Sequence, residues 1–178
     1  DGKPNPHAWM ALESARAYVK NITDGLSYYD EANRIKYEEN AKIYISKIEN
    51  TLLPLIEKID KINKKERWLV TSEGAFSYLA RDLELNELYI WPINADQQGS
   101  PKQVKKVIDS INENAIKVIF SESTISPKPA QQIARETKIR YGGVLYVDSL
   151  TDGNGPVPTY IDLLNTTYST VISGLTAQ

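Results

Sequence analysis

The spacing of hydrophobic positions changes along the chain and divides it into an N-terminal helical part and a C-terminal part of alternating elements. The segment before residue 8 contains Pro4 and Pro6, so we expect it to be a loop. Apolar residues at helical spacing then predict a first helix that begins near Leu12 and stops at Gly25. The helical part therefore begins with a short element.

A much longer helix is predicted over residues 30–62, where apolar residues form a stripe between Lys and Glu positions. Asp30 is a candidate N-cap, and Pro54 should kink or interrupt the helix. A helix of this length would reach about 50 Å. That length suits a strut between two bodies better than a small domain. The stripe consists of Ile35, Ile43, Ile45, Ile48, Leu52, Leu55, Ile56, Ile59 and Ile62.

From Trp68 onward, short apolar runs alternate with amphipathic segments. This alternation, with strands that are almost continuously apolar, is typical of a parallel sheet with helices on both faces. We therefore predict an α/β fold class that follows a long linking helix. The expected strands are 68–71, 88–91, 118–120 and 143–147, and the expected helices are 75–83, one from Pro101, 129–138 and 159–173.

Three carboxylates follow expected strands: Glu73, Glu122 and Asp148. Ligands of open parallel sheets gather beyond the carboxyl ends of the strands, so the three should share one rim. Like charges at one place need a cation or a proton, which suggests a metal site. Each residue also has a structural alternative. Glu73 could cap the next helix, Glu122 could bond to nearby hydroxyls, and Asp148 could form a turn.

Composition narrows the possible chemistry. The formal net charge is -2 with both signs interspersed, so nothing suggests a surface for nucleic acid. The absence of cysteine removes disulfides and thiolate metal sites. His7 is the single histidine, so a metal site here has at most one imidazole, and a surface or packed histidine is the alternative interpretation.

Motifs for other mechanisms are missing from the sequence. No apolar run approaches the roughly 18–20 residues that span a bilayer. There is no phosphate-binding loop, dinucleotide fingerprint or nucleophile elbow. The pair Gly142-Gly143 is interpreted as a turn.

Several motifs together resemble one family. Asn5-Pro6-His7-Ala8-Trp9 and the segment Val70–Tyr78 resemble the metal-binding branch of the solute-binding proteins of ABC transporters, which serve manganese, zinc and iron uptake. Segments 120–123 and 146–150 fit the same pattern. The strings Trp91-Pro92-Ile93-Asn94-Ala95-Asp96 and Gly155-Pro156-Val157-Pro158-Thr159-Tyr160 look most like the periplasmic manganese/iron proteins of Gram-negative bacteria.

The resemblance implies three metal ligands in this chain, His7, Glu73 and Asp148. Glu122 is not a ligand in the family pattern, so it is expected to have a supporting role. Members of the family have two α/β lobes joined by a long helix, and their first ligand is a histidine of the N-terminal lobe. Most of that lobe is missing here, so we expect a piece of a longer protein or an unusual member, with weaker metal binding.

The resemblance divides the chain into a remnant of the N-terminal lobe (1–29), a linking helix (30–64) and a C-terminal metal-binding lobe (65–178). It implies a binding protein rather than an enzyme, which carries Mn²⁺, or alternatively Zn²⁺ or Fe²⁺, to the permease of an ABC transporter. The expected location is the periplasm, or the cell exterior if the precursor is a lipoprotein. The alternatives are a surface adhesin of the same family and a metal-dependent hydrolase.

Overall fold

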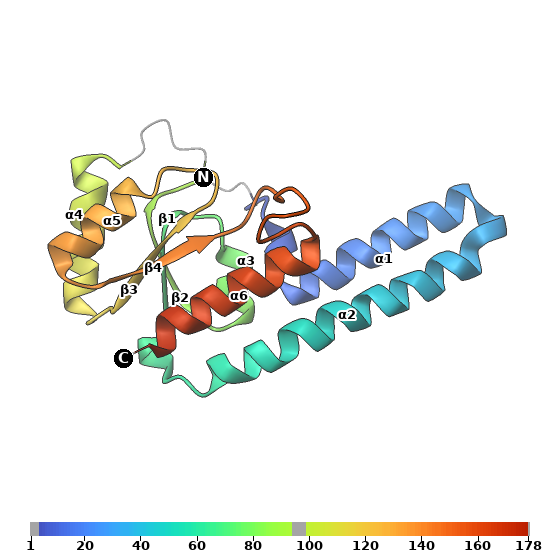
Figure 1. Ribbon diagram of the computed structural model, residues 1–178, viewed down its shortest axis with the longest axis horizontal. Helices are drawn as coiled ribbons and strands as arrows, with labels where there is room; N and C mark the ends of the chain where they lie inside the picture. The colour runs from blue at the N-terminus through green and yellow to red at the C-terminus, as the bar shows by residue number, and fades with distance from the viewer. Residues whose placement is uncertain (1–3, 94–98, 178) are drawn as a thin grey trace.

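The computed structural model describes residues 4–93 and 99–177. The chain forms an α/β body from which a long pair of helices projects (Figure 1). The last three residues of the motif 91–96 lie outside the described residues. In the described part of the chain, no helix is long and apolar enough to cross a membrane.

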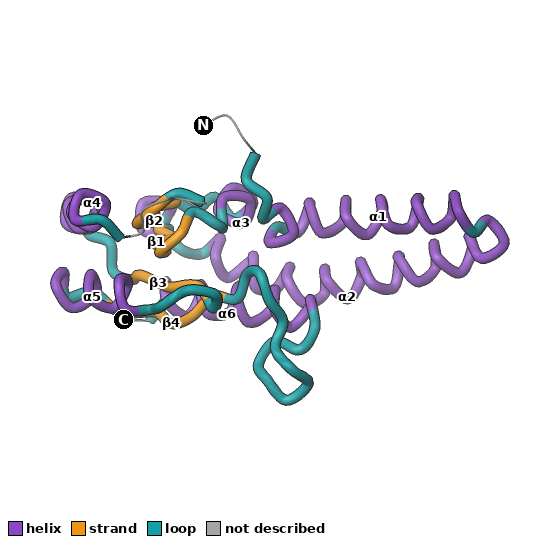
Figure 2. Tube along the Cα trace, turned by 90° about the horizontal axis from the view of Figure 1, so that it is seen from above, coloured by secondary structure: helices purple, strands orange, loops and turns teal. Residues whose placement is uncertain are grey.

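The projecting part is a helical hairpin. A short 3-10 turn, Ala8–Met10, leads into α1 (Leu12–Tyr29), and a second turn, Glu31–Asn33, reverses the chain into α2 (Arg34–Asp60). Figures 1 and 2 show the two helices side by side, with the base of the hairpin against the body and its tip far from it. The predicted long helix is therefore present, but it pairs with the first helix along its length.

Two expectations for this region were wrong, and a third is settled in part. Gly25 does not end the first helix, which continues to Tyr29. Asp30 does not cap α2, because its carboxylate accepts hydrogen bonds from the side chains of Asn33 (2.9 Å) and Tyr37 (2.7 Å) at the chain reversal. Pro54, expected to kink or interrupt α2, lies inside the helix and does not interrupt it. Leu52 and Ile59, on either side of the proline, are fully buried, so packing holds this part of the helix in place.

The predicted apolar stripe of the long helix is only partly buried. Ile48, Leu52 and Ile59 lie in the core, but Ile35 and Ile43 are exposed. The far half of the hairpin also exposes several apolar side chains of α1. The buried positions of α2 are those nearest the body, because only there does another layer cover the helix.

The α/β body is confirmed, and its strands are parallel. Strand β1 pairs with β2, and β3 pairs with β4. The two pairs meet along β1 and β3, which lie next to each other. The register brings Glu73 opposite Trp91 and Glu122 opposite Leu145, at the carboxyl ends of their strands. The elements are β1 (Trp68–Glu73), α3 (Ser77–Asp82), β2 (Asn86–Trp91), α4 (Pro101–Glu113), β3 (Val118–Glu122), α5 (Lys128–Thr137), β4 (Arg140–Leu145) and α6 (Tyr160–Thr176).

Helices cover the strands from both sides, as predicted. Alternate strand residues face different cores, since successive side chains of a strand point to opposite faces. Val70 and Ile119 pack with α4 and α5, whereas Leu69 and Phe120 pack with α6 and the base of the hairpin. The core that contains Leu69 and Phe120 also contains Met10, so it joins the strands to the N-terminal segment that carries His7.

The pair Gly142-Gly143 is part of β4, not the turn that we predicted. Phe120 lies over it, and a Cβ atom on Gly142 would come within 2.3 Å of the ring. Gly143 has φ +109°, and the register of the ladder shifts between Ile119 and Ser121. The glycines thus provide space for an aromatic side chain and a bulge in the strand.

Candidate metal centre

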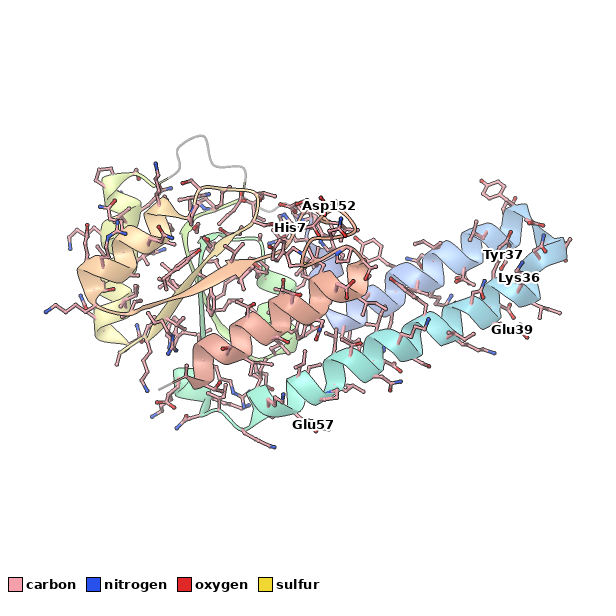
Figure 3. All side chains as sticks on the ribbon, viewed as in Figure 1. His7, Lys36, Tyr37, Glu39, Glu57 and Asp152 are labelled. Carbon is pink, nitrogen blue, oxygen red and sulfur yellow. The ribbon has the colours of Figure 1, made fainter. Side chains whose placement is uncertain are left out.

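His7 lies in the loop that enters the first 3-10 turn, and its side chain is 8% exposed. Its ring meets the ring of Trp9 edge to face, with 5.3 Å between the centroids. The Trp9 indole N–H donates to the carbonyl of Val147 (2.9 Å), and the Tyr160 hydroxyl donates to the Trp9 carbonyl. The N-terminal loop is therefore fixed against the end of the fourth strand. Figure 3 shows His7 in the body, while Lys36, Tyr37 and Glu39 lie toward the hairpin tip.

The structure brings His7 and Asp148 together. Nε2 of His7 lies 3.2 Å from Oδ1 of Asp148. Two donor atoms about 2.1 Å from a common ion are separated by roughly 3.0 Å in octahedral and roughly 3.4 Å in tetrahedral coordination. The observed separation lies between these values, so both atoms fit the coordination shell of one metal ion.

Asp148 does not follow the strand directly, as we had expected. β4 ends at Leu145, and the backbone of Tyr146 bonds to the hydroxyl of Thr167 on α6 (3.1 Å from its N–H and 2.8 Å to its carbonyl). Side chains thus replace the ladder for three backbone groups of this segment, the N–H and carbonyl of Tyr146 and the carbonyl of Val147. It then presents the half-exposed carboxylate of Asp148 to His7.

Glu73 is the last residue of β1, at the same end of the body. Among residues 4–93 and 99–177, however, no three His, Asp or Glu side chains converge closely enough to hold one ion together. Glu73 is connected to His7 through the neighbouring residue, since the Gly74 carbonyl accepts a hydrogen bond from Asn5 (2.8 Å), whose other end contacts His7. The structure thus pairs two of the predicted ligands, and it links the third to them only through Gly74 and Asn5.

Glu122 is almost fully buried, at 1% exposure, and its Oε1 accepts a hydrogen bond from the backbone N–H of Glu73 (2.9 Å). Burial raises the pKa of the Glu122 carboxyl to about 7, although hydrogen bonds to its charged form act in the opposite direction. The residue therefore contacts the backbone of a predicted ligand instead of the exterior of the rim.

Sequence reasoning gave no role to Asn5 or Trp9, although both belong to the motif around His7. Asn5 bonds to both nitrogen atoms that His7 presents to it, the backbone N–H and Nδ1. An available signal was the position of an asparagine two residues before the histidine, where its side chain commonly accepts from the backbone N–H at that spacing. Trp9 carried no comparable local signal, because its partner Val147 is distant in the sequence.

Comparison with known proteins gives strong matches over nearly the whole chain. The family model described as the zinc-uptake complex component A, periplasmic (ZnuA), matches residues 1–174. The iron-binding protein YfeA of Yersinia pestis is 55% identical over 173 residues, and the manganese ABC transporter substrate-binding lipoprotein PsaA of Streptococcus pneumoniae is 30% identical over 174 residues. These alignments cover 97% and 98% of this chain, but 56% of each relative.

Solved structures match as well. The manganese-bound periplasmic metal-binding protein of Candidatus Liberibacter asiaticus superposes with a TM-score of 0.93 at 48% identity, over 98% of this chain and 65% of that one. The periplasmic zinc-binding protein TroA of Treponema pallidum shares the fold, with a TM-score of 0.89 at 18% identity, over 99% of this chain and 65% of that one. From the 56% coverage of YfeA and PsaA, the chain spans little more than half the length of the curated relatives that it matches.

Proposed function

This chain belongs to the family of ZnuA-type metal-binding, substrate-binding proteins of ABC transporters, and on that premise we propose that it captures a divalent transition-metal ion for delivery to a membrane permease. The observation that carries the proposal is the buried imidazole of His7, whose Nε2 faces Oδ1 of Asp148 at 3.2 Å. Two such donors tolerate close approach when a cation or a proton lies between them.

We propose His7, Asp148 and Glu73 as the metal ligands. One imidazole and two carboxylates form a donor set that favours manganese and ferrous iron over zinc, compared with a site of imidazoles or thiolates. Zinc would still bind tightly, because affinities of divalent ions follow the Irving–Williams order. Mn²⁺ is therefore the proposed cargo, with Fe²⁺ and Zn²⁺ as alternatives. The relatives named for iron and for manganese support the same choice.

The proposed role involves capture and release without bond chemistry. We propose that residues 65–178 form the metal-binding lobe, that α2 is the linking helix of residues 30–64, and that residues 1–29 belong with the preceding lobe. The relatives named as lipoproteins or periplasmic proteins support a periplasmic or lipid-anchored location. The permease of an ABC transporter is the proposed partner, because PsaA is named as a substrate-binding lipoprotein of such a transporter.

Thermal unfolding with added Mn²⁺ or Zn²⁺ tests the proposal. An ion present at 100 times its Kd should stabilise the folded chain by about 2.7 kcal/mol through mass action. Asp148→Ala and Glu73→Ala should remove most of this gain, because each takes a charged donor from the site. If both variants gain as much stability as the unmodified chain, the ligand assignment is wrong.

Asp152→Ala is a matched control. Asp152 follows Asp148 in the same C-terminal loop, but its carboxylate accepts from the backbone N–H of Asn154 (3.1 Å). The variant removes the same charge at a position that we do not assign to the metal. It should therefore keep the metal-induced gain, and an equal loss in all three variants would indicate a general effect of negative charge.

A further inference from the structure

Asn5 lies between two segments that carry proposed ligands, and its amide group contacts both. Nδ2 donates to the carbonyl of Gly74 (2.8 Å) and to Oγ of Ser77 (3.2 Å). Oδ1 is 3.0 Å from the backbone nitrogen of His7 and 2.8 Å from its Nδ1. One side chain thus connects the imidazole to the turn that follows Glu73.

The partners of Asn5 determine which way its amide faces. The carbonyl of Gly74 can only accept a hydrogen bond, and the backbone N–H of His7 can only donate one. A flipped amide would lose both interactions, so Oδ1 must face His7. Since an amide oxygen only accepts, Nδ1 of His7 must carry a hydrogen. In the neutral ring, the lone pair then belongs to Nε2, which faces Asp148.

We infer that Asn5 is a positioning residue for metal binding, which selects the Nδ1–H tautomer of His7 and aligns its Nε2 with the Glu73–Gly74 turn. The inference rests on the proposed function, because it assigns Nε2 as the donor to the ion. A hydrogen-bond acceptor on the second ring nitrogen fixes both the tautomer and the ring orientation of a metal-binding histidine. Loss of such a partner typically lowers metal affinity about 10- to 100-fold.

The loop itself does not depend on Asn5 alone. Trp9 is bonded to Val147, Tyr160 to Trp9, and the Tyr168 hydroxyl donates to the carbonyl of Met10 (3.1 Å). None of these bonds reaches a nitrogen of the His7 ring. Replacing Asn5 should therefore leave the loop in place while releasing the orientation of the imidazole.

The tautomer can be observed directly, because His7 is the only histidine of the chain and gives a single pair of ring ¹⁵N signals. We would record them in the metal-free Asp148→Ala variant, because the Asp148 carboxylate, 3.2 Å from Nε2, would otherwise accept a proton from that nitrogen, and at a pH above which the signals no longer change. The expected result is a protonated Nδ1 and an unprotonated Nε2. Adding Asn5→Ala to this variant should yield a mixture of both tautomers. Asn5→Ala alone should bind Mn²⁺ about 10- to 100-fold more weakly in calorimetric titration.

Asn5→Asp separates the two contacts of the amide. Its carboxylate still accepts from Nδ1 but cannot donate to the Gly74 carbonyl, so the tautomer should persist although the contact with the turn after Glu73 is lost. Asn63→Ala is the matched control. Asn63 makes the same type of turn, accepting from the N–H of Lys65 at 3.0 Å, in the segment before β1. It should change neither the tautomer nor the affinity.

The outcomes distinguish this inference from the proposed function. A protonated Nε2 in the neutral ring of Asp148→Ala, or unchanged tautomer and affinity when Asn5→Ala is introduced, would overturn the positioning role even if the chain binds Mn²⁺. Failure of the unmodified chain to bind either Mn²⁺ or Zn²⁺ would overturn the proposed function. The tautomer measurement needs no metal, so it remains informative in that case about what Asn5 does to His7.

Discussion

The carboxyl group of Glu122 accepts a hydrogen bond from the backbone N–H of Glu73 across the boundary between the two strand pairs, with 2.9 Å between Oε1 and the nitrogen. Glu73 ends β1 and Glu122 ends β3, and the assigned ladders join each of these strands to its outer neighbour. The bond therefore links the pairs at the edge where we place the metal. It explains why a carboxylate that we do not assign as a ligand is buried beside one that we do.

The burial of Glu122 predicts a pH-dependent stability. The pKa of Glu122 is about 7 in the folded chain, against an ordinary value of 4.5. Between pH 4.5 and 7, the folded state therefore holds a proton that the unfolded state has lost. The contribution of this group is full below pH 4.5 and is lost as pH rises through about 7. The shift in pKa corresponds to about 3 kcal/mol in the free energy of unfolding. Glutamine cannot ionise. The free energy of unfolding of Glu122→Gln should therefore rise by about this much, relative to that of the unmodified chain, between pH 4.5 and 8.

Urea unfolding of the metal-free protein at several pH values measures this difference. Glu113→Gln is the control, because Glu113 is an exposed residue at the end of α4 and charge there is not opposed by burial. The control should not reproduce the increase. A constant difference between Glu122→Gln and the unmodified chain from pH 4.5 to 8 would show that Glu122 titrates alike in the folded and unfolded states.

The proposed ligand set predicts how metal preference can be changed. Replacing the carboxylate of Glu73 by imidazole moves the donor set toward the softer ligands that suit zinc. Glu73→His should therefore raise the ratio of zinc to manganese affinity by on the order of tenfold, or about 1.4 kcal/mol. Competitive titration with both ions measures the ratio. Glu113→His adds an imidazole away from the site and should leave the ratio unchanged.

Much of the fold was predictable because its signals are local. The apolar runs beginning at Trp68 and Val118 each became a strand, and Pro101 begins a helix whose Ser100 and Gln103 form a capping box. The errors arose where a distant partner decides the structure. Gly142 lies in a strand because Phe120 occupies the space above it. β4 ends at Leu145 because Thr167 and Trp9 satisfy the backbone of the next residues.

The candidate site was predictable to a similar extent. Glu73 and Glu122 could be placed at one edge of the body because both follow apolar runs of parallel strands. The contact of His7 with Asp148 could not be derived that way, since it joins an N-terminal loop to a segment beyond the fourth strand, and it was expected from the family resemblance alone. The link from Asn5 to Gly74 spans 69 sequence positions, and no periodicity indicates it.

Arg67 is predicted to stabilise the junction between the hairpin and the body. The side chain is buried, and it donates from Nε to the carbonyl of Ile62 (2.9 Å) and from a terminal nitrogen to the carbonyl of Asp60 (2.9 Å). Arg67→Ala leaves two carbonyls at the end of α2 without these donors, at a cost of about 1–3 kcal/mol. Denaturant unfolding measures the loss. Metal affinity should not change, because Arg67 precedes β1 and Glu73 ends it.

The matched control for this variant is Arg81→Ala. Arg81 is exposed, lies over the ring of Tyr78 and pairs with Asp82 at the surface. Its loss should cost less than about 1 kcal/mol, as is usual for exposed ion pairs. Equal losses in both variants would mean that the capping of α2 contributes no more than a surface contact.

Two glycine-to-alanine substitutions should change the stability of the chain in opposite directions. A Cβ atom on Gly142 would lie 2.3 Å from Cε1 of Phe120 and 2.7 Å from a methyl group of Val118, so Gly142→Ala should destabilise the chain by about 1–3 kcal/mol. A Cβ atom on Gly25 meets no heavy atom within 4 Å, and the residue is inside α1. Gly25→Ala should therefore stabilise by about 0.5–1 kcal/mol, because alanine favours a helix over glycine.

The double variant Gly142→Ala with Phe120→Leu tests the cause of the first effect. If the ring of Phe120 opposes the new methyl group, the double variant should be more stable than the sum of the single changes predicts, since leucine leaves space over residue 142. Thermal and urea unfolding of the four proteins give this coupling. Strict additivity would assign the cost of Gly142→Ala to the contact with Val118 or to the backbone of β4, and not to the contact with Phe120. Gly174 also lies under this ring, where a Cβ atom would come within 2.3 Å of Cζ, so Gly174→Ala should show the same coupling to Phe120→Leu.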